Sequence, residues 1–436
     1  MSDDNLSQRL ARLERLRKLG VHRGADHLKR EPPVRSTRSP ISDTLPGEAI
    51  DTPFGPAWAR TVRYPLAGRP DLAALLEITG EAFAALGRDP ALAGLEPARA
   101  AFVDTETTGL ATDAGTYTFL IGVGVYEKDP SGPGDPKGPA EFVVHQFFMR
   151  SPAEERAQLH LVEGALGHCT GVVSFNGRAF DLPLIQARFT LARIPPPLPG
   201  APHLDLLPPA RRIYRARLDS CRLSSLEQHV LGVQRTGEDV PSWLIPCIYR
   251  DYYQHGIGLD LMSRVFYHNL MDIVAMPLLA ARMARFFQAA DPAPLLVDLH
   301  PLECISLARC YEASGWAAAG ESAYRAALAG ALSPAERGQV YRDLGFLLKR
   351  LERRAEAAAL WEEWISSVPG ADLTPYVELA KHHEWHTGDL EAARGWAAWA
   401  LRIAEGWPPG PGRPETLAEL RHRLARLERK LAEICP

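Results

Sequence analysis

Two acidic residues follow a short apolar run in the stretch AFVDTETTGL, residues 101–110. Alternate side chains of an extended strand face the same way, so Asp104 and Glu106 are expected to point to one side. Two carboxylates held this close repel each other unless a cation lies between them. The pair therefore indicates a divalent metal site at the end of a buried strand.

Two further aspartates could complete this site. Asp181 lies in GVVSFNGRAFDLPLI, where a strand is expected to end and a helix to begin, and Asp272 lies in the helical stretch VFYHNLMDIVAMPLLA. An Asp at a helix start is more often a cap than a ligand, so the joint pattern carries more weight than either residue. Two Mg²⁺ or Mn²⁺ ions about 3.5–4 Å apart would neutralise four such carboxylates and hold the attacking and leaving oxygens of a phosphodiester.

Three motifs resemble those of a known nuclease family. FVDTETTGL, FNGRAFDLPLI and HNLMDI are similar to the three motifs of the DEDD (DnaQ-like) 3′-5′ exonuclease superfamily. The wider run over about residues 56–290, with GTYTFLIGVG and DVPSWLIPCIYRDYY, resembles the YprB-type ribonuclease-H-like domains of bacteria. The resemblance implies that two divalent metal ions are bound by four residues: Asp104, Glu106, Asp181 and Asp272.

The same resemblance implies contacts with substrate. The backbone around Thr107 and the side chain of Leu110 would meet the terminal nucleotide, and Asn176 would lie beside the second motif.

The residue that would serve the attacking water departs from the family pattern. The Tyr-type subgroup has this residue four positions before the last Asp and the His-type subgroup five, whereas this chain has His268 at four and Tyr267 at five. On a helix, position i−4 shares a face with Asp272, so His268 is the better candidate. An ordinary pKa near 6.5 suits a general base at neutral pH. Simple packing or local hydrogen bonding of His268 stays an alternative.

Two other clusters have both a functional and a plain interpretation. ARRIYRARLDSCR, residues 210–222, contains five arginines with only Asp219 opposing them, which would suit phosphate binding or a solvated helix face. Arg211 and Arg212 are the substrate-binding candidates in this run. His382 and His386 in KHHEWH lie one helical turn apart, but a third metal ligand is missing, and a polar surface is the favoured interpretation.

Composition limits the remaining choices. A chain of 436 residues is expected to form two folded units, and a net charge of −4 leaves nucleic-acid binding to local basic patches. Six cysteines without a CxxC pair argue against a disulfide framework and a cysteine zinc site. Neither a secretory signal nor a membrane span is recognised, so a cytoplasmic location is expected.

Three regions are expected along the chain. Residues 1–55 form a basic, largely flexible arm, and residues 56–292 have mixed α/β patterns. Strands are expected at 98–107, 117–127, 141–149 and 171–176, with helices at 151–169 and 181–194. This order is typical of ribonuclease-H-like folds.

Residues 298–436 are Ala- and Leu-rich and are expected to be entirely helical. A small residue precedes an aromatic residue by four positions three times: Gly320 and Tyr324, Ala357 and Trp361, Ala392 and Trp396. Twelve positions before these small residues lie Ala308, Gly345 and Ala380. The pattern resembles the tetratricopeptide repeat, with Pro369 where that motif often ends, although a generic helical bundle stays open. Stacked helix pairs of this kind leave a concave face for a protein partner.

The expected fold is thus an α/β ribonuclease-H-like domain, a mixed central sheet flanked by helices, followed by an all-α tetratricopeptide-like repeat domain. The expected function is metal-dependent hydrolysis of single-stranded DNA or RNA, as a 3′-5′ exonuclease. One alternative is an interaction scaffold with a weak or inactive nuclease fold; another is a structure-selective endonuclease with the same residues.

Overall fold

The computed structural model describes residues 45–109, 115–128, 139–236, 239–289, 291–368, 370 and 372–434. Two compact units divide between Ala290 and Asp291. Leu110, Pro369 and residues 1–44 of the expected basic arm lie outside the described residues.

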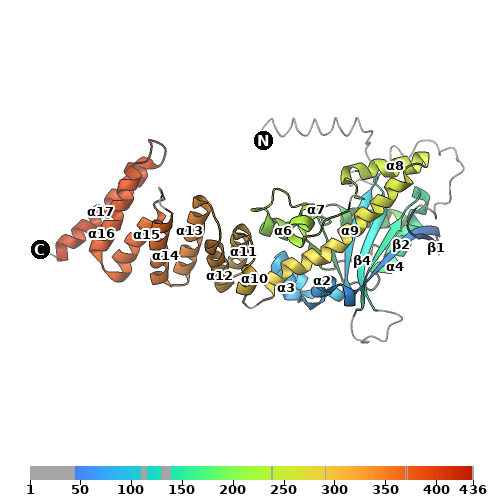
Figure 1. Ribbon diagram of the computed structural model, residues 1–436, viewed down its shortest axis with the longest axis horizontal. Coiled ribbons are helices and arrows are strands. Elements are labelled where there is room, and N and C mark those ends of the chain that lie inside the picture. Colours follow the sequence, from blue (N-terminus) through green and yellow to red (C-terminus); the bar gives the residue numbers. More distant parts are fainter. Residues whose placement is uncertain are drawn as a thin grey trace. The chain divides into compact units, whose positions relative to one another are not determined.

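A seven-stranded mixed sheet forms the centre of the first unit (Figure 1). Its strand order is β1-β2-β5-β4-β3-β6-β7. Neighbours from β1 to β3 in this order are antiparallel, whereas β6 pairs parallel with β3, and β7 parallel with β6. The strands are β1 (Glu48–Thr52), β2 (Gly55–Pro65), β3 (Ala100–Thr107), β4 (Thr118–Glu127), β5 (Glu141–Phe148), β6 (Gly171–Ser174) and β7 (His203–Asp205). The expected mixed sheet, with β3, β4 and β5 as its meander, is confirmed.

The β1–β2 hairpin corrects the expected extent of the flexible arm. β1 lies wholly within residues 1–55, and its Glu48 pairs with Ala59 of β2. The segment looked like a linker because it is rich in proline and glycine. Trp58 explains the ordered hairpin, because its side chain is buried and its indole Nε1 donates to the carbonyl of Pro46 at 3.1 Å.

Helices cover both faces of the sheet. One core contains Val103, Ile121 and Val123 of the strands, packed with residues of α4 and α5 such as Leu159 and Phe189. The helices of this unit are α2 (Pro70–Ala73), α3 (Gly80–Gly87), α4 (Glu155–Leu166), α5 (Asp181–Ala192), α6 (Leu207–Tyr214), α7 (Leu223–Leu226), α8 (Ile245–His255) and α9 (Leu259–Ala284).

The opposite face packs against α8 and α9. Phe119 and Phe148 of the strands join Tyr249 of α8 and Phe266 of α9 in a second core, where the rings of Phe119 and Tyr249 stack at 4.0 Å. Successive residues of a regular strand face opposite sides, so Phe119 and Ile121 would share a face and Leu120 would point the other way. At the irregular start of β4, however, Phe119 and Leu120 both belong to the second core. The long helix α9 therefore lies against the strands that carry the acidic residues.

The second unit is helical throughout its described residues, 291–368, 370 and 372–434, where no strand occurs. Gly345 packs so closely on Trp361 that a Cβ atom at residue 345 would lie 2.4 Å from the indole Nε1. The small and aromatic residues of the sequence pattern thus meet between helices. The helices are α10 (Ala293–Leu296), α11 (Pro301–Ala313), α12 (Ala317–Ala329), α13 (Pro334–Arg350), α14 (Arg354–Ser367), α15 (Thr374–His382), α16 (Leu390–Glu405) and α17 (Arg413–Ile434).

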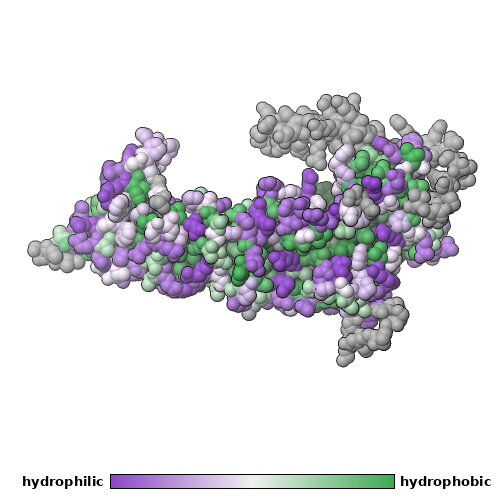
Figure 2. Space-filling view, in the orientation of Figure 1, coloured by the Kyte–Doolittle hydropathy of each residue, from purple (hydrophilic) through white to green (hydrophobic). Residues whose placement is uncertain are grey.

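Surface polarity of the helical unit is mixed. Figure 2 shows hydrophilic residues spread over the visible face of this unit, with small hydrophobic areas between them. Among the described helices of the whole chain, none is long and apolar enough to cross a membrane.

Candidate active site

Asp104 and its neighbours are positioned by close packing between β4 and α9. Asp104 on β3 pairs in register with Gly122 on β4. A Cβ atom at Gly122 would lie 2.4 Å from Oδ1 of Asn269 on α9, so only glycine lets the helix approach this closely. Asn269 Nδ2 then donates to Asp104 Oδ2 at 2.9 Å. The helix and the first acidic motif are thereby joined directly.

Asp181 begins α5, immediately after the loop that follows β6. The hydroxyl of Thr105 on β3 donates to Asp181 Oδ1, which ties the second motif to the first. Gly177 makes room here, because a Cβ atom on it would lie 3.2 Å from Asp181 Oδ2 and 2.6 Å from Ser174 Oγ.

The electrostatics show that the acidic residues are neighbours. Burial raises the pKa of Asp104 well above its ordinary value, and the charges of Asp272 and Asp181 raise it further. The pKa of Glu106 is also raised well above its ordinary value, by burial first and then by Asp104, Asp272 and Asp181. Burial raises the pKa of Asp181 to about 6. Burial and the neighbouring carboxylates therefore both disfavour the charged forms of Asp104 and Glu106.

The expected metal site of four carboxylates stays a prediction. No group of three or more His, Cys, Asp or Glu side chains in the described ranges is arranged to hold a metal ion. The reason lies partly at Asp272 on α9, whose Oδ1 accepts an ion-paired hydrogen bond from Arg235. This carboxylate is turned toward a protein cation.

His268 and Tyr267 occupy different surroundings on α9. His268 Nε2 lies 3.6 Å from Asp272 Oδ2, one helical turn away, and 3.3 Å from Ser242 Oγ. Tyr267 instead accepts a hydrogen bond on its hydroxyl from the backbone N–H of Thr236 at 3.1 Å. The helical geometry thus brings His268, rather than Tyr267, next to the last acidic residue.

Arg235 and Asp239 are two site residues that the sequence interpretation missed. His268 Nδ1 lies 2.6 Å from Asp239 Oδ1, and Arg235 Nη1 donates to Asp239 Oδ2 at 3.2 Å. Burial alone would lower the pKa of His268, but the hydrogen bond to Asp239 and the charge of Asp272 outweigh it and raise that pKa. One signal was available: RTGED, residues 235–239, combines charged residues and ends on the first residue of DVPSWLIP, within the run that carries the resemblance.

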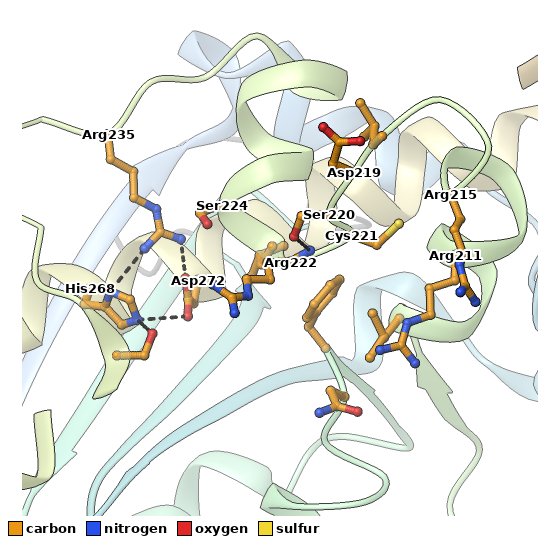
Figure 3. Close-up of a pocket in the computed structure, with 16 residues that line it drawn as sticks. Arg211, Arg215, Asp219, Ser220, Cys221, Arg222, Ser224, Arg235, His268 and Asp272 are labelled. Carbon is orange, nitrogen blue, oxygen red and sulfur yellow. Dashed lines mark hydrogen bonds and ion pairs between the residues drawn. The ribbon is translucent and has the colours of Figure 1, made fainter. Parts of the chain in front are cut away.

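A cavity of about 730 Å³ opens beside these residues (Figure 3). Figure 3 shows Arg235, His268 and Asp272 together on one side and Arg211 and Arg215 on the other. The polar and charged residues that line the cavity are Asn176, Arg211, Arg215, Asp219, Ser220, Arg222, Ser224, Arg235, Ser242, His268 and Asp272. Of the four acidic candidates, Asp272 therefore lines the cavity together with the arginines, whereas Asp104, Glu106 and Asp181 are not among its lining residues.

The other substrate-binding candidates fall into three groups. Asn176 lines the cavity with a left-handed backbone (φ 67°), which is held by its N–H donating to Asp205 Oδ1 at 2.8 Å. Arg212 is directed elsewhere and donates to the carbonyl of Leu86. Thr107 uses its hydroxyl locally, donating to the carbonyl of Gly109 at 2.7 Å, and Leu110 lies outside the described residues.

Comparison with known proteins defines the class. Residues 101–284 match the RNase_H superfamily, a span that contains β3 to β7 and all four acidic residues. This match and the mixed sheet identify a nuclease-type fold.

The chain is also 30% identical over 382 residues to a Bacillus subtilis (strain 168) protein described as uncharacterized protein YprB. The alignment covers 85% of this chain and 85% of that protein. The chain belongs to the YprB family.

Proposed function

We propose that the protein is a metal-dependent nuclease that hydrolyses phosphodiester bonds of single-stranded nucleic acid from the 3′ end. The observation that carries this proposal is the crowding of buried carboxylates around Asp104 and Glu106, whose charged neighbour Asp272 lines an arginine-rich cavity. Such crowding raises the free energy of the folded protein unless cations neutralise it. Phosphodiester cleavage is a reaction that uses the same cations.

The donor chemistry of the site fits hard divalent cations. Carboxylate oxygens are the ligands that Mg²⁺ and Mn²⁺ prefer, and burial first, then the neighbouring carboxylates, raise the pKa values of Asp104 and Glu106. Two ions would be held by Asp104, Glu106, Asp181 and Asp272, with Asp272 shared between a metal and Arg235. When bound, the ions would supply charge neutralisation and an activated water.

The protein itself supplies the proton acceptor. Because the carboxylate of Asp239 can only accept, the 2.6 Å contact places the proton of neutral His268 on Nδ1. The free lone pair is then on Nε2, which faces Asp272 and Ser242 at the cavity. His268 is thus oriented to take a proton from an attacking water.

The cavity wall suggests how the strand is held. Arg211, Arg215 and Arg222 line it, so successive phosphates of one strand can meet guanidinium groups while the terminal phosphodiester approaches Asp272. Arg212 has no part in this contact, because it is used against Leu86. A cavity of this size encloses a single strand more readily than a duplex.

The test is incubation of the purified chain with 5′- or 3′-end-labelled single-stranded DNA, single-stranded RNA and duplexes, with Mg²⁺, Mn²⁺ or EDTA. Stepwise shortening of the 5′-labelled single strand, only with metal, is expected. Glu106→Gln should abolish it, whereas Glu96→Gln, which changes an exposed carboxylate just before β3, should not. Cleavage that survives both EDTA and Glu106→Gln would exclude the proposed site, and internal cuts would favour an endonuclease.

We further infer that the second unit is a tetratricopeptide-like array. The support is the contact of Gly345 with Trp361 between α13 and α14, and the contact of Gly320 with the carbonyl of Ala308, 3.5 Å from a Cβ placed on the glycine. Small residues at these positions let paired helices pack closely, as the repeat requires.

A further inference from the structure

Arg235 lies at the centre of a buried charge cluster that joins the last acidic motif to the candidate base. Only 8% of its side chain is exposed, and it contacts three carboxylates: Glu227, Asp239 and Asp272. An arginine buried among this many acids holds its proton firmly, and its pKa is raised further. The cluster is therefore permanently cationic at its centre.

Glu227 fixes the plane of this guanidinium. Its two carboxylate oxygens accept from Nε and Nη2 of Arg235, each at 2.6 Å, which is the two-pronged geometry that fits arginine and not lysine. The Glu227 side chain is 1% exposed, so the pair is screened little by solvent. The Glu227 carboxylate thus holds the guanidinium of Arg235 in one orientation.

The remaining N–H groups of Arg235 reach three residues on the site side, and one of these contacts is direct to the imidazole, with Nη1 3.3 Å from His268 Nδ1. Nη2 donates to Asp272 Oδ1, and Nη1 donates to Asp239 Oδ2 at 3.2 Å. The other oxygen of each carboxylate faces His268: Asp239 Oδ1 at 2.6 Å from Nδ1, and Asp272 Oδ2 at 3.6 Å from Nε2. A single guanidinium therefore sets the rotation of both carboxylates that flank the imidazole.

We propose that Arg235 is a positioning residue, which fixes the rotation of the Asp272 carboxylate and, through Asp239, holds His268 with Nε2 toward the cavity. The inference rests on the proposed nuclease function but goes beyond its motifs, because Arg235 belongs to none of them. The side chains of Arg235 and Asp239 contact Asp272 and His268, through which they would act.

Charge and geometry predict opposite effects when Arg235 is replaced. Loss of the cation leaves Asp272 and Asp239 uncompensated, which should strengthen binding of Mn²⁺ to the free protein. Loss of the fixed orientation should lower kcat by about 10–100-fold, while KM changes little. Tighter or equal metal binding combined with slower turnover is a result that simple unfolding cannot produce.

The experiment measures Mn²⁺ affinity by calorimetry without substrate, thermal stability, and kcat and KM on labelled single-stranded nucleic acid. Arg235→Lys keeps the positive charge but loses the two parallel hydrogen bonds that the guanidinium makes, so it should bind Mn²⁺ as the wild type does and lose part of kcat. Arg235→Ala should lose more, and added methylguanidinium should restore part of it. Arg211→Ala, which removes a cation from the opposite wall, should raise KM and leave Mn²⁺ affinity unchanged.

Asp239→Asn provides a second variant in case Arg235→Ala does not fold, since it keeps the Arg235–Glu227 pair. It should lower kcat about 10-fold or more without weakening Mn²⁺ binding. An unchanged kcat in both variants, or loss of stability, metal binding and kcat together in both, would overturn the proposal. If the wild type cleaves no nucleic acid, the proposed function fails, and the Mn²⁺ affinities alone decide: an Arg235→Ala protein that binds Mn²⁺ more weakly than the wild type refutes the inference.

Discussion

Replacing Asp181 by Asn should stabilise the metal-free protein at neutral pH. The pKa of Asp181 is raised from 3.8 to about 6, mainly by burial. Because the folded state binds this proton more tightly than the unfolded state, the stability contributed by protonated Asp181 is complete below about pH 4 and is lost as the pH rises through 6. At about 1.4 kcal/mol for each pKa unit, the charged form costs up to about 3 kcal/mol at pH 7.

Hydrogen exchange of β3 and α5 peptides in the full chain provides the measurement. In EDTA, the free energy of opening for Asp181→Asn relative to the wild type should increase by up to about 3 kcal/mol between pH 4 and pH 7. Comparing the two proteins at the same pH removes the intrinsic pH dependence of exchange. The asparagine keeps an acceptor for Thr105, so the hydrogen bond between the two motifs is not the variable.

Asp219→Asn serves as the matched control, because it changes an exposed carboxylate on the wall of the same cavity. Its free energy of opening relative to the wild type is measured over the same pH range. Added Mn²⁺ should stabilise the wild type at pH 7 and reduce the advantage of Asp181→Asn. Parallel curves for wild type and Asp181→Asn across this pH range would refute the reasoning, since they would mean that Asp181 carries no excess charge in the folded state.

Three further predictions concern catalysis and packing. Asp104→Ala should abolish cleavage, measured on end-labelled strands, and leave the metal-free fold equally or more stable, because one of the crowded carboxylates is removed; unchanged cleavage contradicts the site. His268→Ala should lower turnover by about 10²–10⁴-fold with little loss of metal binding, and Tyr267→Phe should do much less; the reverse ranking would assign the water to the tyrosine. Gly345→Ala should destabilise the helical unit by about 1–3 kcal/mol in denaturant unfolding, because its Cβ would overlap an indole. Gly395→Ala, on an exposed helix face with open space, should instead stabilise the unit by about 0.5–1 kcal/mol. Equal effects of the two substitutions would contradict the close helix contact.

The central strands and the helical second unit could be predicted because their patterns are local. The apolar runs in AAFVDTET and TFLIGVGVYE are bounded by turns and predict strands. Asp104 and Glu106 lie at the end of the first of these runs. The periodicity of small and aromatic residues after residue 298 likewise depends only on neighbours along one helix. The β1–β2 hairpin was missed, since its order depends on the long-range burial of Trp58.

The site could be predicted only as far as its chemistry lies in motifs. The resemblance to three motifs implies the four acids, and helical geometry favours His268 over Tyr267. Arg235 and Asp239 could not be found this way, because they lie outside regular helices and strands and reach His268 across about 30 residues of sequence. Their role depends on how that segment folds back onto α9. Arg212 illustrates the opposite error: its sequence surroundings suggest phosphate binding, and its contact with Leu86 gives it a different partner.

The contact between Gly122 and Asn269 has a consequence for mutational tolerance. Gly122 carries no functional group, yet a methyl group there would lie 2.4 Å from the amide oxygen of Asn269 and would displace the side chain that donates to Asp104. Asp104 would then lose its partner on α9 through a substitution that lies outside the acidic motifs. In a scan of every single substitution for activity, position 122 should therefore be as intolerant as the acidic positions, while the cavity wall formed by α6 would keep its shape. Under the proposed nuclease function, such a variant would serve as a protein that binds single-stranded nucleic acid without cleaving it.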